Sequence, residues 1–240
     1  MQSLNEKILR SALASKIAYA PDCKIVSNLP ASYQLQGIKN ISCKIVDIKK
    51  TGAHVYCWNS GENAKLIAFR GVHDYKYMLN YMNPKMKEIH MRDNIIKVHS
   101  NILDNFYSLE EELSDYIFDK PINNKKKSIT FCGHSAGGVL AMIAAAYYGD
   151  ITSDNTHITC HTFGSPKVGN IEFHKWYDRN VDESVNIANK HDYARHIPFG
   201  FNYVYNKNII IEDNTLNPLK AHDLDTYQLL LENEIMYKKI

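Results

Sequence analysis

The sequence lacks the features that mark membrane-spanning, secreted and nucleic-acid-binding proteins. No apolar run approaches the roughly 20 residues that a helix needs to cross a bilayer. Residues 1–8 contain Glu6 and no uninterrupted apolar run, so they do not look like a secretory signal peptide. The formal net charge of +2 is too small to favour nucleic acid as a partner. We therefore expect a soluble, cytoplasmic protein with no transmembrane segment and no nucleic-acid partner.

Cysteine is also scarce, with an odd number of five residues and no close-spaced pair. This pattern indicates neither a metal site nor a complete disulfide framework. A reducing compartment fits this use of cysteine. The residues interpreted as buried free thiols are Cys23, Cys43, Cys57, Cys132 and Cys160.

The rest of the composition is typical of one globular domain. Hydrophobic residues make up 45% and charged residues 22% of the 240 residues, and α/β folds commonly use such a length as a single domain. The chain has no internal repeats and no low-complexity segment. We expect residues 1–240 to form a single domain.

Apolar periodicity predicts strands that alternate with helices. Helices are expected at residues 4–19, 102–117, 170–177 and 222–231, and another begins shortly after residue 135. Strands are expected at residues 41–48, 53–58, 64–69, 128–132, 158–163, 181–188 and 203–211, with a hairpin turn at Ser60 and Gly61. Residues 22–40 carry mixed signals and predict no element. The alternation predicts an α/β fold with a mainly parallel central sheet and helices on both faces, which gathers catalytic groups at the carboxyl ends of the strands.

A G-x-S-x-G pattern at residues 133–137 lies between an expected strand and an alanine-rich helix. Ser135 would stand at the tip of a sharp strand-to-helix turn, where the flanking glycines remove steric conflict. The N-terminus of the following helix favours negative charge beside it. A tight turn capped by a serine is the alternative interpretation. The flanking strand and helix favour a nucleophile.

A serine nucleophile needs a histidine base and an acid that orients it, in the chain order Ser, Asp or Glu, His. We favour Asp192 as the acid because it follows an expected strand in a loop. Of the two histidines that follow, His222 is favoured, since His196 is too close to Asp192 to leave freedom to align with Ser135. The other acids weighed for this place include Asp182 and Asp213.

An oxyanion hole in this setting uses two backbone N–H groups. Ala136, the residue after the candidate nucleophile, supplies one, and Val72, in the turn after the strand at 64–69, is the natural source of the other. We assign Arg70 a structural role, bonding carbonyls or a carboxylate near the site. His134 is expected to pack or to hydrogen-bond locally.

Residues 75–91 are unusually rich in tyrosine and methionine. Such side chains make an adaptable, amphipathic surface that can cover or touch apolar ligands. An ordinary packed helix is the alternative interpretation. The residues expected to contact substrate here are Tyr75, Tyr77, Met78, Tyr81 and Met82.

Motifs that follow one another from Leu66 to Tyr227 resemble the class 3 (fungal-type) lipases. The block from Thr162 to Asn170 is the most specific of them, because a generic hydrolase does not require it. The motifs are Leu66-Ile67-Ala68-Phe69-Arg70-Gly71, Val98-His99, Gly133-His134-Ser135-Ala136-Gly137-Gly138, Thr162-Phe163-Gly164-Ser165-Pro166-Lys167-Val168-Gly169-Asn170, Asp192 with Ile197-Pro198, and His222-Asp223 with Tyr227.

This resemblance implies an α/β-hydrolase that cleaves carboxylic esters of acylglycerols or phospholipids without a cofactor, with Ser135, Asp192 and His222 as its triad. It also implies a lid at about residues 73–93 and a lipid ester substrate met at a lipid–water interface. Two positions depart from the family pattern: Val72 stands where Thr or Ser is usual, and Asn101 stands where a glycine is usual. The alternatives are a non-lipid carboxylesterase or acyltransferase, and a catalytically silent lipid-binding protein.

Overall fold

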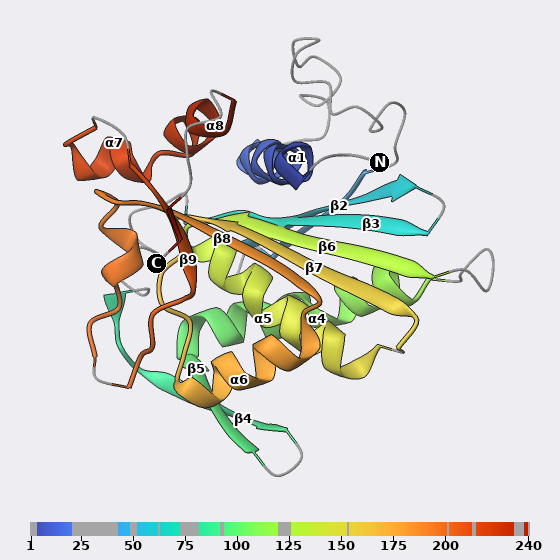
Figure 1. Cartoon of the computed structure of the whole chain (residues 1–240). Coiled ribbons are helices and arrows are strands. Elements are labelled where there is room, and N and C mark those ends of the chain that lie inside the picture. The colour runs from blue at the N-terminus through green and yellow to red at the C-terminus, as the bar shows by residue number, and fades with distance from the viewer. Residues whose placement is uncertain are drawn as a thin grey trace.

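A computed structural model describes residues 4–20, 43–48, 52–61, 63–72, 82–91, 94–119, 126–152, 154–200, 202–212, 215–232 and 238–239. Its centre is an eight-stranded sheet (Figure 1). The strands are β1 (Cys43–Ile48), β2 (Ala53–Gly61), β3 (Ala64–Phe69), β6 (Lys127–His134), β7 (Thr156–Phe163), β8 (Glu183–Asn189), β9 (Asn208–Ile211) and β10 (Lys238–Lys239), in the order β1-β2-β3-β6-β7-β8-β9-β10. Strands β3 to β9 of this order run parallel, whereas β1, β2 and β10 pair antiparallel at the two edges.

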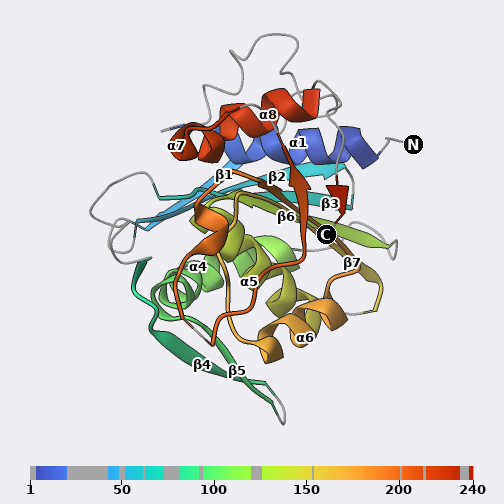
Figure 2. The ribbon, with the colours of Figure 1, turned by 60° about the vertical axis from the view of Figure 1, so that its left-hand side comes forward.

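Helices cover both faces of the sheet. Helices α1 (Leu4–Ile17) and α8 (Leu224–Glu232) lie side by side on one face, while α4 (Ser100–Phe118), α5 (Ala136–Ile151) and α6 (Ile171–Asn180) pack on the other (Figure 1, Figure 2). Helix α5 is buried along most of its length, because its many alanines and glycines let it approach the sheet and two neighbouring helices closely. The expected mainly parallel sheet with helices on both faces is confirmed.

The interpretation of the tyrosine- and methionine-rich segment as a packed helix is wrong for residues 86–91, whereas residues 75–81 lie outside the described residues. Residues 86–91 do not form a helix; they form strand β4 (Met86–Met91), which pairs antiparallel with β5 (Asn94–His99) in a separate two-stranded sheet. The pairing sets Ile89 opposite Ile96, and both side chains are buried. Cross-strand burial of this kind outweighs the helical propensity of methionine and lysine.

Other boundaries also differ from the expected ones. The strand expected at 203–211 is limited to β9, because the backbone before it pairs elsewhere: the Val204 N–H donates to the Gly169 carbonyl oxygen (3.0 Å). The helix expected at 222–231 corresponds to α8, which begins at Leu224, whereas His222 is the last residue of a separate short helix, α7 (Pro218–His222). Strand β2 continues through Ser60 and Gly61, so the turn follows these two residues.

The described cysteines agree with the expected free thiols. Cys57, Cys132 and Cys160 are free and buried, and burial raises the pKa of each thiol to about 12, so all three stay protonated. Cys23 and the side chain of Cys43 lie outside the described residues, as do residues 22–40. Among the helices that the structure describes, none has the length and apolar character required to span a bilayer.

Candidate active site

Ser135 stands in the turn between β6 and α5, in a strained backbone conformation. Its φ of 56° and ψ of −132° are unusual for a residue with a side chain. The turn is also too tight for a side chain at Gly133, where a Cβ would lie 2.2 Å from the Gly137 carbonyl oxygen. This strain and this close approach are what a strand–nucleophile–helix elbow requires.

The side chains of Ser135, His222 and Asp192 form one hydrogen-bonded line. His222 Nε2 is 2.9 Å from Ser135 Oγ, and His222 Nδ1 is 2.9 Å from each carboxylate oxygen of Asp192. A carboxylate accepts, so Nδ1 carries the proton and Nε2 of the neutral ring presents a lone pair to the serine hydroxyl. The structure thus brings together the three residues that we expected to act as a triad.

Local sequence explains how each partner reaches this place. Asp192 follows the carboxyl end of β8, and His222 is the last residue of α7. That short helix begins where Asn217 accepts hydrogen bonds from the backbone N–H groups of Leu219 and Lys220. The three side chains therefore meet at the carboxyl edge of the parallel strands.

Among the described residues, the Asp192 carboxylate has three hydrogen-bond partners, whereas the His222 imidazole has two. The Asp192 side chain is fully buried, Oδ1 accepts from the Ala194 backbone N–H (2.7 Å), and Oδ2 accepts from the Tyr227 hydroxyl (2.7 Å). The Tyr227 hydroxyl in turn accepts from the Asn189 backbone N–H (2.8 Å). Burial, followed by the Asp192 charge, raises the pKa of Tyr227 well above its usual value, so the hydroxyl remains a donor. The role of Tyr227 was not assigned from the sequence beyond its place in the family motif.

The alternative acids and base do not join this line. Asp182 accepts from the Ile158 backbone N–H (2.7 Å) near the amino ends of β7 and β8. Ser135 lies at the other, carboxyl ends of the parallel strands. His196 contacts the Tyr205 hydroxyl through Nδ1 (3.3 Å). Asp213 lies outside the described residues.

His134 makes long-range contacts that the sequence did not indicate. Its Nε2 is 2.7 Å from the backbone carbonyl oxygen of His222, and its Nδ1 is 2.8 Å from the hydroxyl of Tyr19. Since the carbonyl only accepts, Nε2 carries the proton and Nδ1 accepts from Tyr19. Burial, followed by the charge of His222, lowers the pKa of His134 to about 3, so the ring stays neutral. The expected packing of His134 is confirmed, since the ring is buried, but its hydrogen bonds join distant segments instead of sequence neighbours.

A cleft of about 500 Å³ opens above Ser135. It is lined mainly by apolar side chains, and Ser135 and His222 also border it. Val72 and Ala136, the expected sources of oxyanion N–H groups, both border it. The lining residues are Val72, Met82, Ser135, Ala136, Pro166, Tyr193, Ala194, His196, Ile197, Phe199 and His222. Such a cleft suits an apolar ligand with its reactive group at the serine.

Of the five side chains expected to contact substrate, Met82 is the one that lies within the described residues. It is half exposed and lines the cleft. Tyr75, Tyr77, Met78 and Tyr81 lie outside the described residues, so their contact with substrate stays a prediction. Arg70 donates to the Gly52 carbonyl oxygen (3.3 Å), which agrees with its expected structural role. Within the described ranges, no three His, Cys, Asp or Glu side chains gather in a way that could hold a metal ion.

The sequence also matches a known protein family. Residues 66–202, more than half of the chain, match the family model described as lipase (class 3). A lipase from Caenorhabditis elegans, ZK262.3, is 40% identical over 67 residues, which cover 28% of this chain and 19% of that protein. Phospholipase A1-II 1 from Oryza sativa subsp. indica is 33% identical over 116 residues, covering 43% of this chain and 29% of the relative. The chain therefore spans less than a third of the length of these two relatives.

Two fungal lipases are among the solved structures with the same architecture. Rhizomucor miehei triacylglyceride lipase superposes with a TM-score of 0.67 at 19% identity, covering 88% of this chain and 81% of that one. Lipase II from Rhizopus niveus gives a TM-score of 0.70 at 16% identity, with the same two coverages of 88% and 81%. At these identities the similarity concerns the fold alone.

Proposed function

The chain belongs to the class 3 lipases, and from that premise we propose that it is a serine hydrolase that cleaves carboxylic ester bonds of lipids through an acyl-enzyme intermediate. The observation that carries the proposal is the hydrogen-bonded line from Ser135 Oγ through His222 to the buried Asp192. A serine hydroxyl is a poor nucleophile unless a base accepts its proton, and this line supplies that base in the required tautomer.

In the proposed first step, Ser135 Oγ attacks the ester carbonyl carbon while His222 Nε2 accepts the hydroxyl proton. Asp192 stabilises the positive charge that forms on the imidazole. The backbone N–H groups of Val72 and Ala136 stabilise the oxyanion. When the carbonyl carbon–alkoxy bond breaks, His222 returns the proton to the leaving alcohol, and the acyl group remains on Ser135. A water molecule repeats the sequence and releases the carboxylic acid.

The surroundings of the cleft support a lipid as the substrate, met at a lipid–water interface. The cleft is largely apolar, and Phe199 on its border is 71% exposed. Leu216 and Leu219, which precede His222 in the chain, are 79% and 71% exposed. Large apolar side chains this exposed, close in sequence to a reactive histidine, suit contact with an apolar phase.

We also propose that the lid ends before Met86. Met82 lines the cleft from the segment just before β4, which supports a cover in this place. Strand β4 itself is hydrogen-bonded along its length to β5, so residues 86–91 belong to a fixed two-stranded sheet. A moving lid would therefore consist of residues that precede this strand.

The test is hydrolysis of p-nitrophenyl esters of increasing acyl length and of emulsified acylglycerols by wild type, Ser135→Ala and Ser108→Ala. Ser108 lies on α4 outside the cleft and serves as the matched control. We expect activity that rises with acyl length in wild type and Ser108→Ala, and a loss of about 10⁴-fold or more in Ser135→Ala. Activity that stays flat with acyl length would favour a non-lipid esterase or acyltransferase. Bound lipid without turnover would favour a lipid-binding protein.

A further inference from the structure

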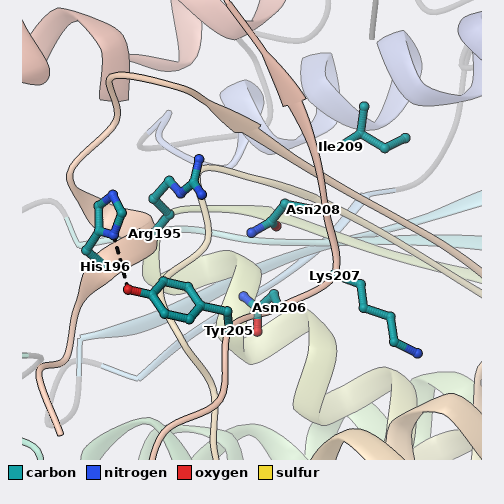
Figure 3. A pocket seen from close by; sticks show the side chains of 7 residues that line it. All are labelled: Arg195, His196, Tyr205, Asn206, Lys207, Asn208 and Ile209. Atoms are coloured by element: carbon teal, nitrogen blue, oxygen red, sulfur yellow. Dashed lines mark hydrogen bonds between the residues drawn. The ribbon is translucent and has the colours of Figure 1, made fainter. Parts of the chain in front are cut away.

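A second cavity, of about 610 Å³, lies beside the substrate cleft, and His196 borders both. Figure 3 shows how two segments form it: Arg195 and His196, from the 3₁₀ turn η2 (Ala194–His196), face the segment of residues 205–209 that leads into β9. The two cavities therefore meet at His196.

The charges around this second cavity are of one sign. Its lining residues are Arg195, His196, Tyr205, Asn206, Lys207, Asn208 and Ile209, none of which is acidic. Lys207 pairs with Asp178 and points away from Arg195 and His196 in Figure 3. The guanidinium of Arg195, in contrast, has no ion pair or hydrogen bond within the described part of the chain, and its Nε is buried without a partner.

A second cation lies behind the aromatic wall of this cavity. Lys167 is only 6% exposed, and its Nζ is 4.5 Å from the centre of the Tyr205 ring. No described carboxylate pairs with it. Burial lowers the pKa of His196, the charges of Arg195 and Lys167 lower it further, and the charge of Asp192 opposes them, so both cations act on the same imidazole. Neither Arg195 nor Lys167 forms an ion pair with a described carboxylate, and a bound anion would supply that missing partner.

We propose that this cavity is an anion subsite of the enzyme, in which Arg195, assisted by Lys167, binds the phosphate of an anionic glycerophospholipid whose ester lies at Ser135. The proposal rests on the proposed function. We assign the anion to the same molecule as the ester because His196 borders both cavities, and a glycerophospholipid carries its phosphate a few bonds from its esters. The planar guanidinium matches phosphate oxygens through two parallel hydrogen bonds.

The experiment compares hydrolysis of phosphatidylglycerol and of diacylglycerol with the same acyl chains, at equal mole fraction in a neutral detergent. Arg195→Gln should lower the ratio of kcat/KM for phosphatidylglycerol to that for diacylglycerol about tenfold, mainly through KM, because a charge-assisted contact is lost. Arg195→Lys keeps the charge and should recover most of the ratio. Lys175→Gln removes an equal charge from an exposed pair on α6 and should leave the ratio within about twofold.

A measurement on the wild type alone keeps the proposal testable if a variant fails to fold. Raising the ionic strength should lower the ratio of kcat/KM for phosphatidylglycerol to that for diacylglycerol. Equal losses on both lipids, an unchanged ratio in Arg195→Gln, or a ratio independent of salt would each overturn the proposal. Glycerol 3-phosphate distinguishes a soluble ligand from a lipid: Arg195-dependent binding of it with no lipid selectivity would also overturn the lipid assignment. If neither lipid is hydrolysed, the proposed function is refuted but the anion subsite is not. Binding to phosphatidylglycerol micelles then tests the subsite: weaker binding of Arg195→Gln than of wild type supports it, and equal binding overturns it.

Discussion

Replacing His134 by alanine tests whether the residue before the nucleophile positions the catalytic histidine. His134 connects Tyr19, just after α1, with the backbone of His222 through two hydrogen bonds of 2.8 Å and 2.7 Å. The imidazole rings of His134 and His222 also pack against each other, with centroids 4.8 Å apart. Without His134, the carbonyl of His222 and the hydroxyl of Tyr19 each lose the hydrogen bond to its imidazole.

The expected effect follows from these contacts. Each lost hydrogen bond in a buried setting costs about 1–2 kcal/mol, so His134→Ala should lower the free energy of unfolding by about 2–4 kcal/mol. A small displacement of His222 should also reduce kcat about tenfold or more, because alignment of the base with Ser135 is lost. KM should change little, since His134 does not line the described cleft. Tyr19→Phe removes one hydrogen bond, so it should cost about 1 kcal/mol and a smaller share of kcat.

The assay is kcat and KM on a soluble p-nitrophenyl ester, at a temperature where denaturant curves show each variant fully folded. Tyr116→Phe is the matched control, because its hydroxyl bonds Asn59 at an exposed site (3.0 Å). Unchanged kcat in folded His134→Ala would refute the positioning role. A change in KM with kcat preserved would also refute it, by indicating contact with substrate instead.

Three further predictions concern the same framework. Tyr227→Phe should lower kcat about tenfold and stability by about 1–2 kcal/mol in denaturant titrations, because Asp192 loses one donor; wild-type kcat would contradict this. Gly164→Ala should abolish ester hydrolysis, since the residue has a φ of +56° and a Cβ there would lie 2.5 Å from Asp192 Oδ2; an active variant would show that this approach is not required. The His161 imidazole, followed by the Lys7 ammonium, lowers the pKa of Glu183 from 4.5 to about 2. Ionised Glu183 therefore stabilises the fold above pH 4.5, and about 2 kcal/mol is lost as the pH falls towards 2. Acid titrations followed by circular dichroism should give a shallower loss of stability in Glu183→Gln, and an equal slope would contradict the assignment.

The parts of the fold that follow from local patterns could be predicted from the sequence. The alternation of apolar strands with helices gave the parallel sheet, and G-x-S-x-G gave the strained turn at Ser135. Chain order and loop placement singled out Asp192 and His222, and the structure brings both to Ser135. These features are readable because periodicity and glycine placement are local properties of the chain.

Features that depend on distant segments could not be predicted. The contacts of His134 with Tyr19 and with the His222 carbonyl join residues 115 and 88 positions apart, and no local pattern encodes them. Strand β4 was missed because its pairing with β5, not its own composition, fixes its conformation. The cations Arg195 and Lys167 meet around His196 only once the loops after two different strands are folded together.

The most direct test of the account is labelling with a fluorophosphonate probe, followed by peptide mapping. The probe phosphonylates an activated serine and displaces fluoride, so it reports the nucleophile that an acyl-enzyme mechanism requires. The account predicts one label per chain, located on Ser135, lost in Ser135→Ala and strongly slowed in His222→Ala. A label on another serine, or equal labelling of wild type and Ser135→Ala, would contradict it.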